Sequence, residues 1–541
     1  GGAVTGRLPV PILAADAVGD VSPDLHARGS ALEVRGSIVW LPHRDGPARH
    51  LGGGGGVRGR LPRVLTAPDS PEVVFVTDAE GEDALEITPA LVPVPVPARR
   101  VGVGAIGRVL QLTAAPDGTR VGLATHDGRV LVVEIESGEV VEIDRSPDGD
   151  ANGLTFSPDS AWLAWSHAGP EPLRHIKVAR VAGDGQRDVI EVTPLRFNDH
   201  DPVFTLDAKY LAFLSARTFD PVYDSHVFDL FFPAGTRPYL VALGSNTPSP
   251  FDAELAGRAP HPPEESKRDQ TEEKEENDAT APAITVELDG IAQRVVPVPV
   301  PAARYSELRA ADGGLVWLHE PMMGVLGDEL AQPGAEHDKP SVLRYDFEKR
   351  RMLTLIDAAE SVAMSGDGKS IVASEGDHLF IVPSTSRAEP APAGAEGPSG
   401  RIEIDTDRIR LQVDPELEWR QMYDEAARIM RDHYWIADMA DVDWDEVVER
   451  YRPLLGRVAT RDDLSELFWE VQGELGTSHA YEEPPPRPVD DLRRLGLLGA
   501  DIDRGDDGRW RVRRVFQGES SVLAARAPLL APGASVGVGE I

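Results

Sequence analysis

The stretch APDGTRVGLAT, residues 115–125, shows the pattern that decides the fold of most of this chain. Its Pro-Asp-Gly sequence favours a tight turn, because proline presets one backbone angle and glycine accepts a positive φ. An apolar run follows the turn directly, and a second one, RVLVVEI, spans residues 129–135. Short runs rich in β-branched residues and separated by turns are typical of antiparallel strands.

The same turn, with an aspartate ahead of an apolar run, recurs along the chain. Its aspartates are Asp69, Asp117, Asp159, Asp207, Asp312 and Asp367, which lie 48, 42, 48, 105 and 55 residues apart. The common spacing suits a four-stranded propeller blade, and the interval of 105 residues is about two periods. Blades bury both faces of their sheets by packing around an axis. We therefore expect a mainly β chain with a seven-bladed β-propeller over residues 59–410; an array of β-sandwiches is the structural alternative.

Two segments do not follow the repeat. Residues 1–58 include SALEVRGSIVWLPHRDGPARHL, which predicts strands without a complete blade, and we interpret them as the end of a preceding β-propeller. The long interval contains an insertion over residues 254–282, in which EESKRDQTEEKEEND has almost no apolar residues. Such a segment cannot bury enough apolar surface to fold, so we expect a disordered or mobile surface loop.

The β pattern changes to a helical one near Asp414. In DPELEWRQMYDEAARIMRDHYW, residues 414–435, apolar side chains recur every three or four positions, which indicates an amphipathic helix. Pro415 suits the first helical turn, and Asp414 suits the N-cap position before it.

Two further helices and a second β region are expected after this one. DWDEVVERYRPLL, residues 443–455, predicts the second helix, and TRDDLSELFWEVQGEL, residues 460–475, predicts the third. Thr460 and Asp463 stand at capping-box spacing. We assign residues 411–483 to a small helical subdomain, residues 484–493 to a Pro-rich linker, and residues 494–541 to a partial β domain.

The composition limits the classes of function. The formal net charge of −35 at pH 7 repels nucleic acid and anionic membranes, so we expect neither as a partner. The chain has no cysteine, which excludes disulfides, thiolate metal sites and a cysteine nucleophile, and we expect no cofactor and no metal. Neither a transmembrane run nor a signal-peptide pattern is present, and we expect a cytoplasmic protein. The first residue is not methionine, so we expect a piece of a longer protein.

One stretch carries candidate catalytic residues. GELGTSHAYE, residues 473–482, places Ser478 next to His479 just after the third expected helix. Neighbouring side chains diverge in a helix and alternate sides in a strand, so Ser478 is poorly placed to be a nucleophile that His479 deprotonates. A base at His479 would therefore need its nucleophile elsewhere. We interpret His433, in RDHYW, as a core or helix-end histidine.

Residues 414–482 resemble the first catalytic subdomain of the tricorn protease family, large cytosolic serine peptidases related to the tail-specific processing peptidases. The stretch that carries the resemblance is VDWDEVVERYRPLLGRVATRDDLSELFWEVQGELGTSHAYE. The expected blades resemble the seven-bladed propeller of that family, which follows a six-bladed one. LGLLGADI through APLLAPGASVGVGEI resembles the first part of its PDZ domain.

The resemblance implies roles for two residues. His479 would be the general base, and Ser478 an accessory member of a catalytic tetrad. The nucleophilic serine, a glutamate that orients the base and the oxyanion-hole amides would come from a second subdomain that follows the PDZ domain, beyond Ile541. The resemblance implies no activity for the 541-residue chain alone, because acyl transfer needs the nucleophile and the oxyanion donors as well as the base.

The whole enzyme implied by the resemblance is a cytoplasmic, homohexameric serine endopeptidase. It would degrade oligopeptides such as proteasome products, with the propeller as a gated access channel. The alternative is a non-enzymatic β-propeller that serves as a binding or scaffold module. The helical segment and the TSHAYE turn favour the peptidase, because a binding propeller needs neither.

Overall fold

The structure is a computed structural model of the chain. The described residues are 8–65, 71–91, 97–183, 188–224, 228–232, 234–252, 284–322, 338–387, 400–483, 498–518, 526–534 and 536–539. The chain divides into two compact units, Gly1–Ala480 and Tyr481–Ile541, and each is described by itself. The expected acidic insertion, residues 254–282, and the expected linker, residues 484–493, lie outside the described residues.

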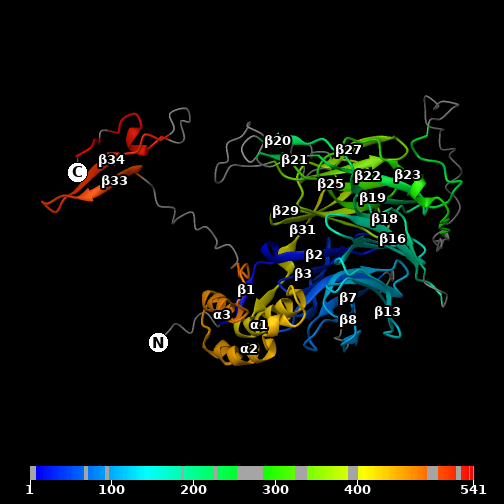
Figure 1. Cartoon of the computed structure of the whole chain (residues 1–541), viewed down its shortest axis with the longest axis horizontal. Helices are drawn as coiled ribbons and strands as arrows, with labels where there is room; N and C mark the ends of the chain where they lie inside the picture. Colours follow the sequence, from blue (N-terminus) through cyan, green and yellow to red (C-terminus); the bar gives the residue numbers. More distant parts are fainter. Residues whose placement is uncertain are drawn as a thin grey trace. The chain divides into compact units, whose positions relative to one another are not determined.

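The first unit is built mainly from antiparallel sheets that follow one another along the chain (Figure 1). Five of them are separate four-stranded sheets in which strand order equals chain order. Their strands are β2 Val18–Pro23, β3 Gly29–Val34, β4 Ser37–Pro42 and β5 Arg49–Gly53; β6 Gly59–Leu65, β7 Glu72–Thr77, β8 Ala84–Pro89 and β9 Arg99–Val101; β10 Val109–Ala114, β11 Arg120–Thr125, β12 Arg129–Glu134 and β13 Val140–Arg145; β24 Tyr305–Ala311, β25 Gly314–His319, β26 Ser341–Asp346 and β27 Arg351–Ile356; and β28 Ser361–Met364, β29 Ser370–Glu375, β30 His378–Pro383 and β31 Ile402–Ile404.

The middle of the chain forms one eight-stranded sheet. Its strands are β14 Ala151–Phe156, β15 Trp162–Ala168, β16 Arg174–Arg180, β17 Val189–Glu191, β18 Asn198–Phe204, β19 Tyr210–Ala216, β22 Thr236–Ala242 and β23 Val295–Pro297. A single parallel pair, Arg174 with Asn198, joins β16 to β18. The sheet is thus two four-stranded antiparallel meanders that meet at one point.

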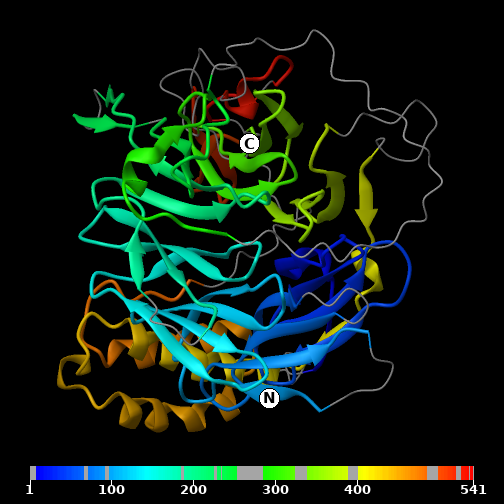
Figure 2. The ribbon, with the colours of Figure 1, turned by 90° about the vertical axis from the view of Figure 1, so that its right-hand side faces the viewer.

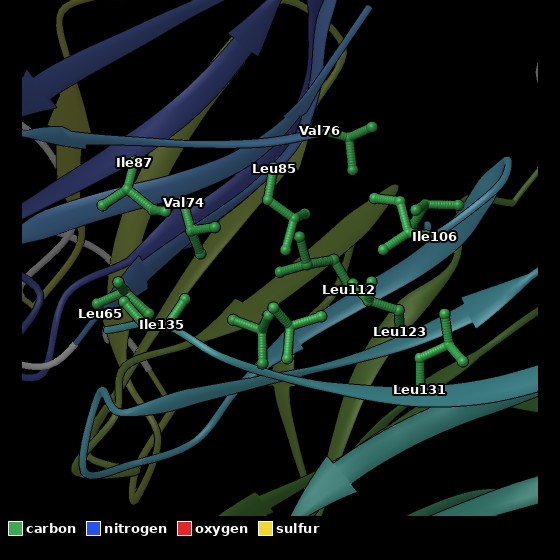
Figure 3. Close-up of a cluster of buried hydrophobic side chains, with 13 residues drawn as sticks. Leu65, Val74, Val76, Leu85, Ile87, Ile106, Leu112, Leu123, Leu131 and Ile135 are labelled. Atoms are coloured by element: carbon green, nitrogen blue, oxygen red, sulfur yellow. The ribbon is translucent and has the colours of Figure 1, made fainter. Parts of the chain in front are cut away.

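Apolar clusters fill the spaces between successive sheets. Figure 3 shows one of them, in which Val74 and Leu85 of one sheet approach Leu112 and Leu123 of the next. All four side chains are at most 2% exposed. Burial of this apolar surface on both faces of a sheet is the main force that holds sheets around an axis. The observed architecture is a β-propeller, as the sequence predicts.

The first and last sheets pack against each other and close the ring. Leu32 and Leu41 share an apolar cluster with Val372 and Leu379. At the adjoining turns, the backbone N–H of Asp367 donates to the carbonyl of Leu25 at 3.0 Å. Figure 2 shows the dark blue start of the ring next to the yellow strands of its end.

The ring closure corrects one expected boundary. Residues 1–58 were expected to end a preceding propeller, yet β2 to β5 form a sheet of this ring. The turn between β2 and β3 carries the same marker as the other sheets, because Asp24 accepts the backbone N–H groups of His26 and Arg28 at 3.1 and 2.8 Å. The sequence interpretation began its repeat at Asp69 and so missed the first sheet.

The long interval between Asp207 and Asp312 also differs from expectation. Among the described residues it contains no additional four-stranded sheet. Asp207 lies in the turn between β18 and β19. The interval after it holds β19, β22 and β23 of that meander, a hairpin of β20 Val222–Asp224 and β21 Asp229–Phe231, and β24, the first strand of the next sheet. Period counting therefore counted inserted chain as a blade and left out the first sheet.

The repeated aspartates stabilise the turns between strands. Asp159, Asp207 and Asp367 each accept a hydroxyl hydrogen bond from the serine or threonine two residues earlier, at 2.5, 2.6 and 2.7 Å. The same carboxylates accept backbone N–H groups two residues later. Such bonds to nearby groups are the reason that aspartate favours turns. The marker is therefore structural.

A helical region follows the propeller in the same unit. It contains α1 Pro415–His433, α2 Trp444–Tyr451 and α3 Arg461–Gly473, with short 3-10 helices at Met439–Asp441 and Arg452–Arg457. Asp414 caps α1 by accepting the N–H groups of Glu416 and Leu417, and Thr460 and Asp463 form the predicted capping box. The helices share one apolar core. Before α1, β32 Leu411–Val413 pairs with β1 Val10–Ile12.

Replacing Thr460 by alanine should weaken the first turn of α3. The Thr460 hydroxyl accepts the N–H of Asp463 at 3.1 Å, and loss of an N-cap costs about 1 kcal/mol. We expect roughly fivefold faster hydrogen exchange in peptides that cover α3. Thr460→Ser keeps the hydroxyl and should exchange like the wild type. Equal exchange in Thr460→Ala and wild type would show that the cap does not stabilise this helix.

The second unit contains one described hairpin. Strand β33 Ala500–Arg504 pairs antiparallel with β34 Trp510–Val515, and a short 3-10 helix follows at Pro528–Leu530. The sequence predicts strands in this region, and the hairpin confirms that prediction. None of the helices in the described ranges is both long and apolar enough to cross a membrane.

Candidate functional site

Helix α1 contacts the ends of the first three sheets through charged side chains. Figure 1 and Figure 2 show the helices, in orange, against the blue and cyan strands. Arg35, in the turn between β3 and β4, donates two hydrogen bonds to Glu418, at 2.7 and 3.0 Å. Arg431 near the end of α1 donates in the same way to Glu82, at 2.8 and 3.1 Å. Paired guanidinium–carboxylate bonds fix orientation as well as distance.

Glu425 lies at the centre of this interface and is 6% exposed. It accepts hydrogen bonds from Arg58 at 2.7 Å, from Gln421 at 2.8 Å and from Arg108 at 3.0 Å. Burial by itself raises the pKa of Glu425, but these three donors outweigh burial and lower the pKa to about 2. Arg58 precedes β6 and Arg108 precedes β10, so one carboxylate ties α1 to two sheets.

A second buried carboxylate adds to the same contact. Asp78, which follows β7, accepts hydrogen bonds from Gln421 and Arg428 of α1, each at 2.9 Å. It also accepts the backbone N–H of Arg58 at 2.7 Å. The helical region is therefore held on the propeller by a connected set of ion pairs, and its position relative to the sheets is specified.

Ser478 and His479 lie on an exposed turn after α3. Leu475, 5% exposed, packs into the helical core and fixes the point from which the turn departs. Gly476 has φ of +59°, and His479 has φ of +63°. A non-glycine residue in the left-handed region is uncommon and costs conformational energy, and such residues cluster at functional sites. Both predicted site residues are at the surface, where another polypeptide segment can reach them.

His433 is the last residue of α1, which agrees with its interpretation as a helix-end histidine. Its ring meets the ring of His126 edge to face, with centroids 5.8 Å apart. Burial lowers the pKa of His433, and the neighbouring His126 and Arg108 lower it further. This histidine therefore contributes to the contact between α1 and the third sheet.

Two features were missed by the sequence interpretation. A cavity of about 350 Å³ lies between the first sheet and α1, lined by residues from separated segments. Its only sequence signal is the run Gly52–Gly56. The stretch GASVG, residues 533–537, also fits the G-x-S-x-G spacing of a nucleophile elbow. Ser535 itself lies outside the described residues, and a short 3-10 helix precedes it where an elbow requires a strand.

Comparison with known proteins identifies the family. Three family models match in order along the chain: the tricorn protease second β-propeller domain over residues 20–385, the tricorn protease C1 domain over residues 415–473, and the tricorn protease PDZ domain over residues 496–541. The chain belongs to the tricorn protease family. The first match begins within β2 and includes β3 to β5, so it agrees with the ring closure, and the helical region corresponds to the C1 domain.

Individual relatives support the same conclusion. Tricorn protease homolog 1 of Streptomyces coelicolor is 52% identical over 541 residues, which cover 100% of this chain and 49% of the relative. Putative tricorn protease homolog 2 of the same organism is 39% identical, over 98% of this chain and 51% of the relative. The crystal structure of the tricorn protease matches with a TM-score of 0.73 at 22% identity, over 96% of this chain and 47% of that one, and shows the likeness of fold. The chain spans about half the length of these relatives.

Proposed function

We propose that this chain forms part of a serine endopeptidase that acts on oligopeptides. The observation that carries the proposal is the ordered match to the propeller, C1 and PDZ domains of tricorn proteases. Only residues 474–476 separate the C1 match from the TSHAYE turn, so the candidate base is close in sequence to a domain of the family. A peptidase of this class needs a base, a nucleophile and oxyanion donors in one place.

His479 is the general base of the proposed enzyme. Its nucleophile is a serine outside the 541 residues, and Ser478 has an accessory role. Exposure of the turn after α3 supports this division of the site, because a serine from another segment can approach the imidazole without a rearrangement of the helices. The ion pairs of Glu425 with Arg58 and of Asp78 with Arg428 support it as well, since they hold the C1 helices in one position on the propeller.

The proposal extends to the architecture of the whole enzyme. The propeller has seven blades if each meander of the eight-stranded sheet counts as one, and the apolar cluster between the first and last sheets supports a closed ring. A ring of this kind is a suitable access channel for peptides. The family resemblance supports a cytoplasmic homohexamer. The helical C1 match distinguishes this chain from a propeller that serves only for binding.

The isolated 541-residue chain should not react with a fluorophosphonate probe. In the proposed division of the site, this chain supplies the general base only. Reaction with the probe also requires the nucleophilic serine and the oxyanion donors. We expect no adduct by intact-mass spectrometry under conditions that label a serine hydrolase completely. Ser535→Ala is the informative companion variant, because Ser535 is the serine with elbow spacing. An adduct at a defined serine, whether removed by Ser535→Ala or located elsewhere in the chain, would overturn the proposed division of the site.

A further inference from the structure

The cavity between the first sheet and α1 is open enough to hold part of a ligand. Its volume of about 350 Å³ lies at the lower end of the range for small-molecule sites. Strands β2 to β4, the loop Gly54–Arg58, β32 and the first turns of α1 form its walls. At Gly55, with φ of +60°, no heavy atom lies within 4 Å of the place that a Cβ would take, so this loop leaves space beside the backbone.

Acidic groups outnumber basic ones around the cavity. Its ionisable lining residues are Glu33, Asp414, Glu418, Glu425, Arg35 and Arg58. Asp414 is engaged as the cap of α1, Glu418 is paired with Arg35, and Glu425 is paired with Arg58 and Arg108.

Among the three glutamates of the cavity lining, Glu33 has the most distant ion-pair partner. Its nearest guanidinium nitrogen, on Arg58, is 3.8 Å away, and it accepts the N–H of Leu61 at 3.3 Å. The Glu33 side chain is 15% exposed. Burial raises the pKa of Glu33, Arg58 offsets only part of that effect, and Asp20 adds a like charge. Because little positive charge compensates the burial of this carboxylate, a compact cation that reaches it would stabilise its charged form.

Space for such a cation exists directly beside the carboxyl group. Gly19 of β2 is exposed, and a Cβ built on it would lie 3.7 Å from the carboxyl carbon of Glu33, an ordinary contact distance. Because Gly19 has no side chain, that position is open. An ammonium group is compact and carries three donors, whereas a guanidinium is planar and larger.

We propose that this cavity binds the primary ammonium group of a short peptide, with Glu33 as its counter-ion. The choice of a peptide as the ligand rests on the proposed function. The ammonium can come from the N-terminus or from a lysine side chain, and both sources share the same chemistry. Bound in this way, a peptide would be held at the contact between the propeller and the C1 helices.

Calorimetric titration of the 541-residue chain with three alanine-based peptide amides tests the proposal. The first peptide has a free N-terminus, the second is N-acetylated, and the third is N-acetylated but contains one lysine. We expect the first or the third to bind, and the second to bind at least tenfold more weakly. The binding member of the pair identifies the source of the ammonium. Equal affinity for all three peptides, or binding of none of them, would overturn the proposal.

Two variants locate the site. Glu33→Gln removes the charge, and Gly19→Val fills the space next to it, so each should weaken binding at least tenfold. Glu142→Gln is the matched control, because Glu142 is paired with exposed Arg145 on β13, outside the cavity lining, and it should bind like the wild type. If folded Glu33→Gln bound the peptide with wild-type affinity, this cavity would be excluded as the peptide-binding site. That result would leave the roles proposed for His479 intact, because binding is measured without turnover.

Discussion

Replacement of His479 by alanine in an enzyme of the relatives' full length is expected to lower kcat by roughly 10³ or more. The variant loses the group that takes the proton of the nucleophilic serine, whereas peptide contacts elsewhere remain. KM should therefore change much less than kcat. Steady-state hydrolysis of a fluorogenic oligopeptide measures both constants.

Two further variants make this result specific. His378, an exposed histidine at the start of β30, is the matched control, and His378→Ala should keep turnover within about twofold of the wild type because the residue contacts no reacting group. Ser478→Ala should lose less activity than His479→Ala, as expected of an accessory group. Near-normal turnover of His479→Ala would contradict the assignment of His479 as the general base.

Replacement of Glu425 by alanine should destabilise the contact between α1 and the propeller by about 3–5 kcal/mol. The substitution leaves the guanidinium groups of Arg58 and Arg108 without the buried carboxylate that accepts from both. Urea unfolding, or hydrogen exchange in peptides covering α1, measures the loss. Glu142→Ala breaks an exposed pair and should change stability little, because exposed ion pairs contribute little. Equal effects of the two variants would show that the buried cluster does not hold the helix.

The same carboxylate has a defined pH signature. The pKa of Glu425 falls from 4.5 to about 2 on folding, so its contribution to stability is complete above about pH 4.5 and is lost as the pH falls toward 2. The difference in unfolding free energy between wild type and Glu425→Gln should shrink over that interval. A difference that stayed constant between pH 5 and pH 2.5 would contradict the low pKa.

Local signals in the sequence predicted individual helices and strands, but they did not predict how the helices pack against the propeller. Asp414 and the capping box at Thr460 set helix starts through bonds to residues two or three positions away, and the structure confirms both. The hydrogen bond between Arg58 and Glu425 joins residues 367 positions apart. A pattern of residues within a short stretch of sequence cannot predict a contact between residues so far apart in the chain.

Periodicity likewise predicted the propeller but misplaced one sheet. The Asp turns identify sheets because the aspartate bonds to its own turn, as Asp159 and Asp367 do. The interval after Asp207 has the length of two blades but contains inserted chain, and length alone does not distinguish the two cases. The sheet that begins at β2 has its marker in Asp24, which follows a proline as Asp117 and Asp159 do, but the sequence interpretation began its repeat only at Asp69.

The candidate site was located by resemblance more than by local chemistry. Ser478 and His479 are adjacent, and the sequence by itself shows only that they cannot form a simple nucleophile and base. The structure adds that both are exposed after α3 and that His479 adopts a left-handed backbone. The cavity beside Glu33 had no counterpart in the sequence interpretation, because the first sheet was assigned to another propeller.

The central claim is that His479 serves a serine that lies outside residues 1–541. Fluorophosphonate labelling of an enzyme of the relatives' full length, followed by mass spectrometry of its peptides, tests this claim most directly. We expect one modified serine outside residues 1–541, and labelling at least about 10² slower in His479→Ala. A modified serine within residues 1–541, or a labelling rate unchanged by His479→Ala, would contradict the claim.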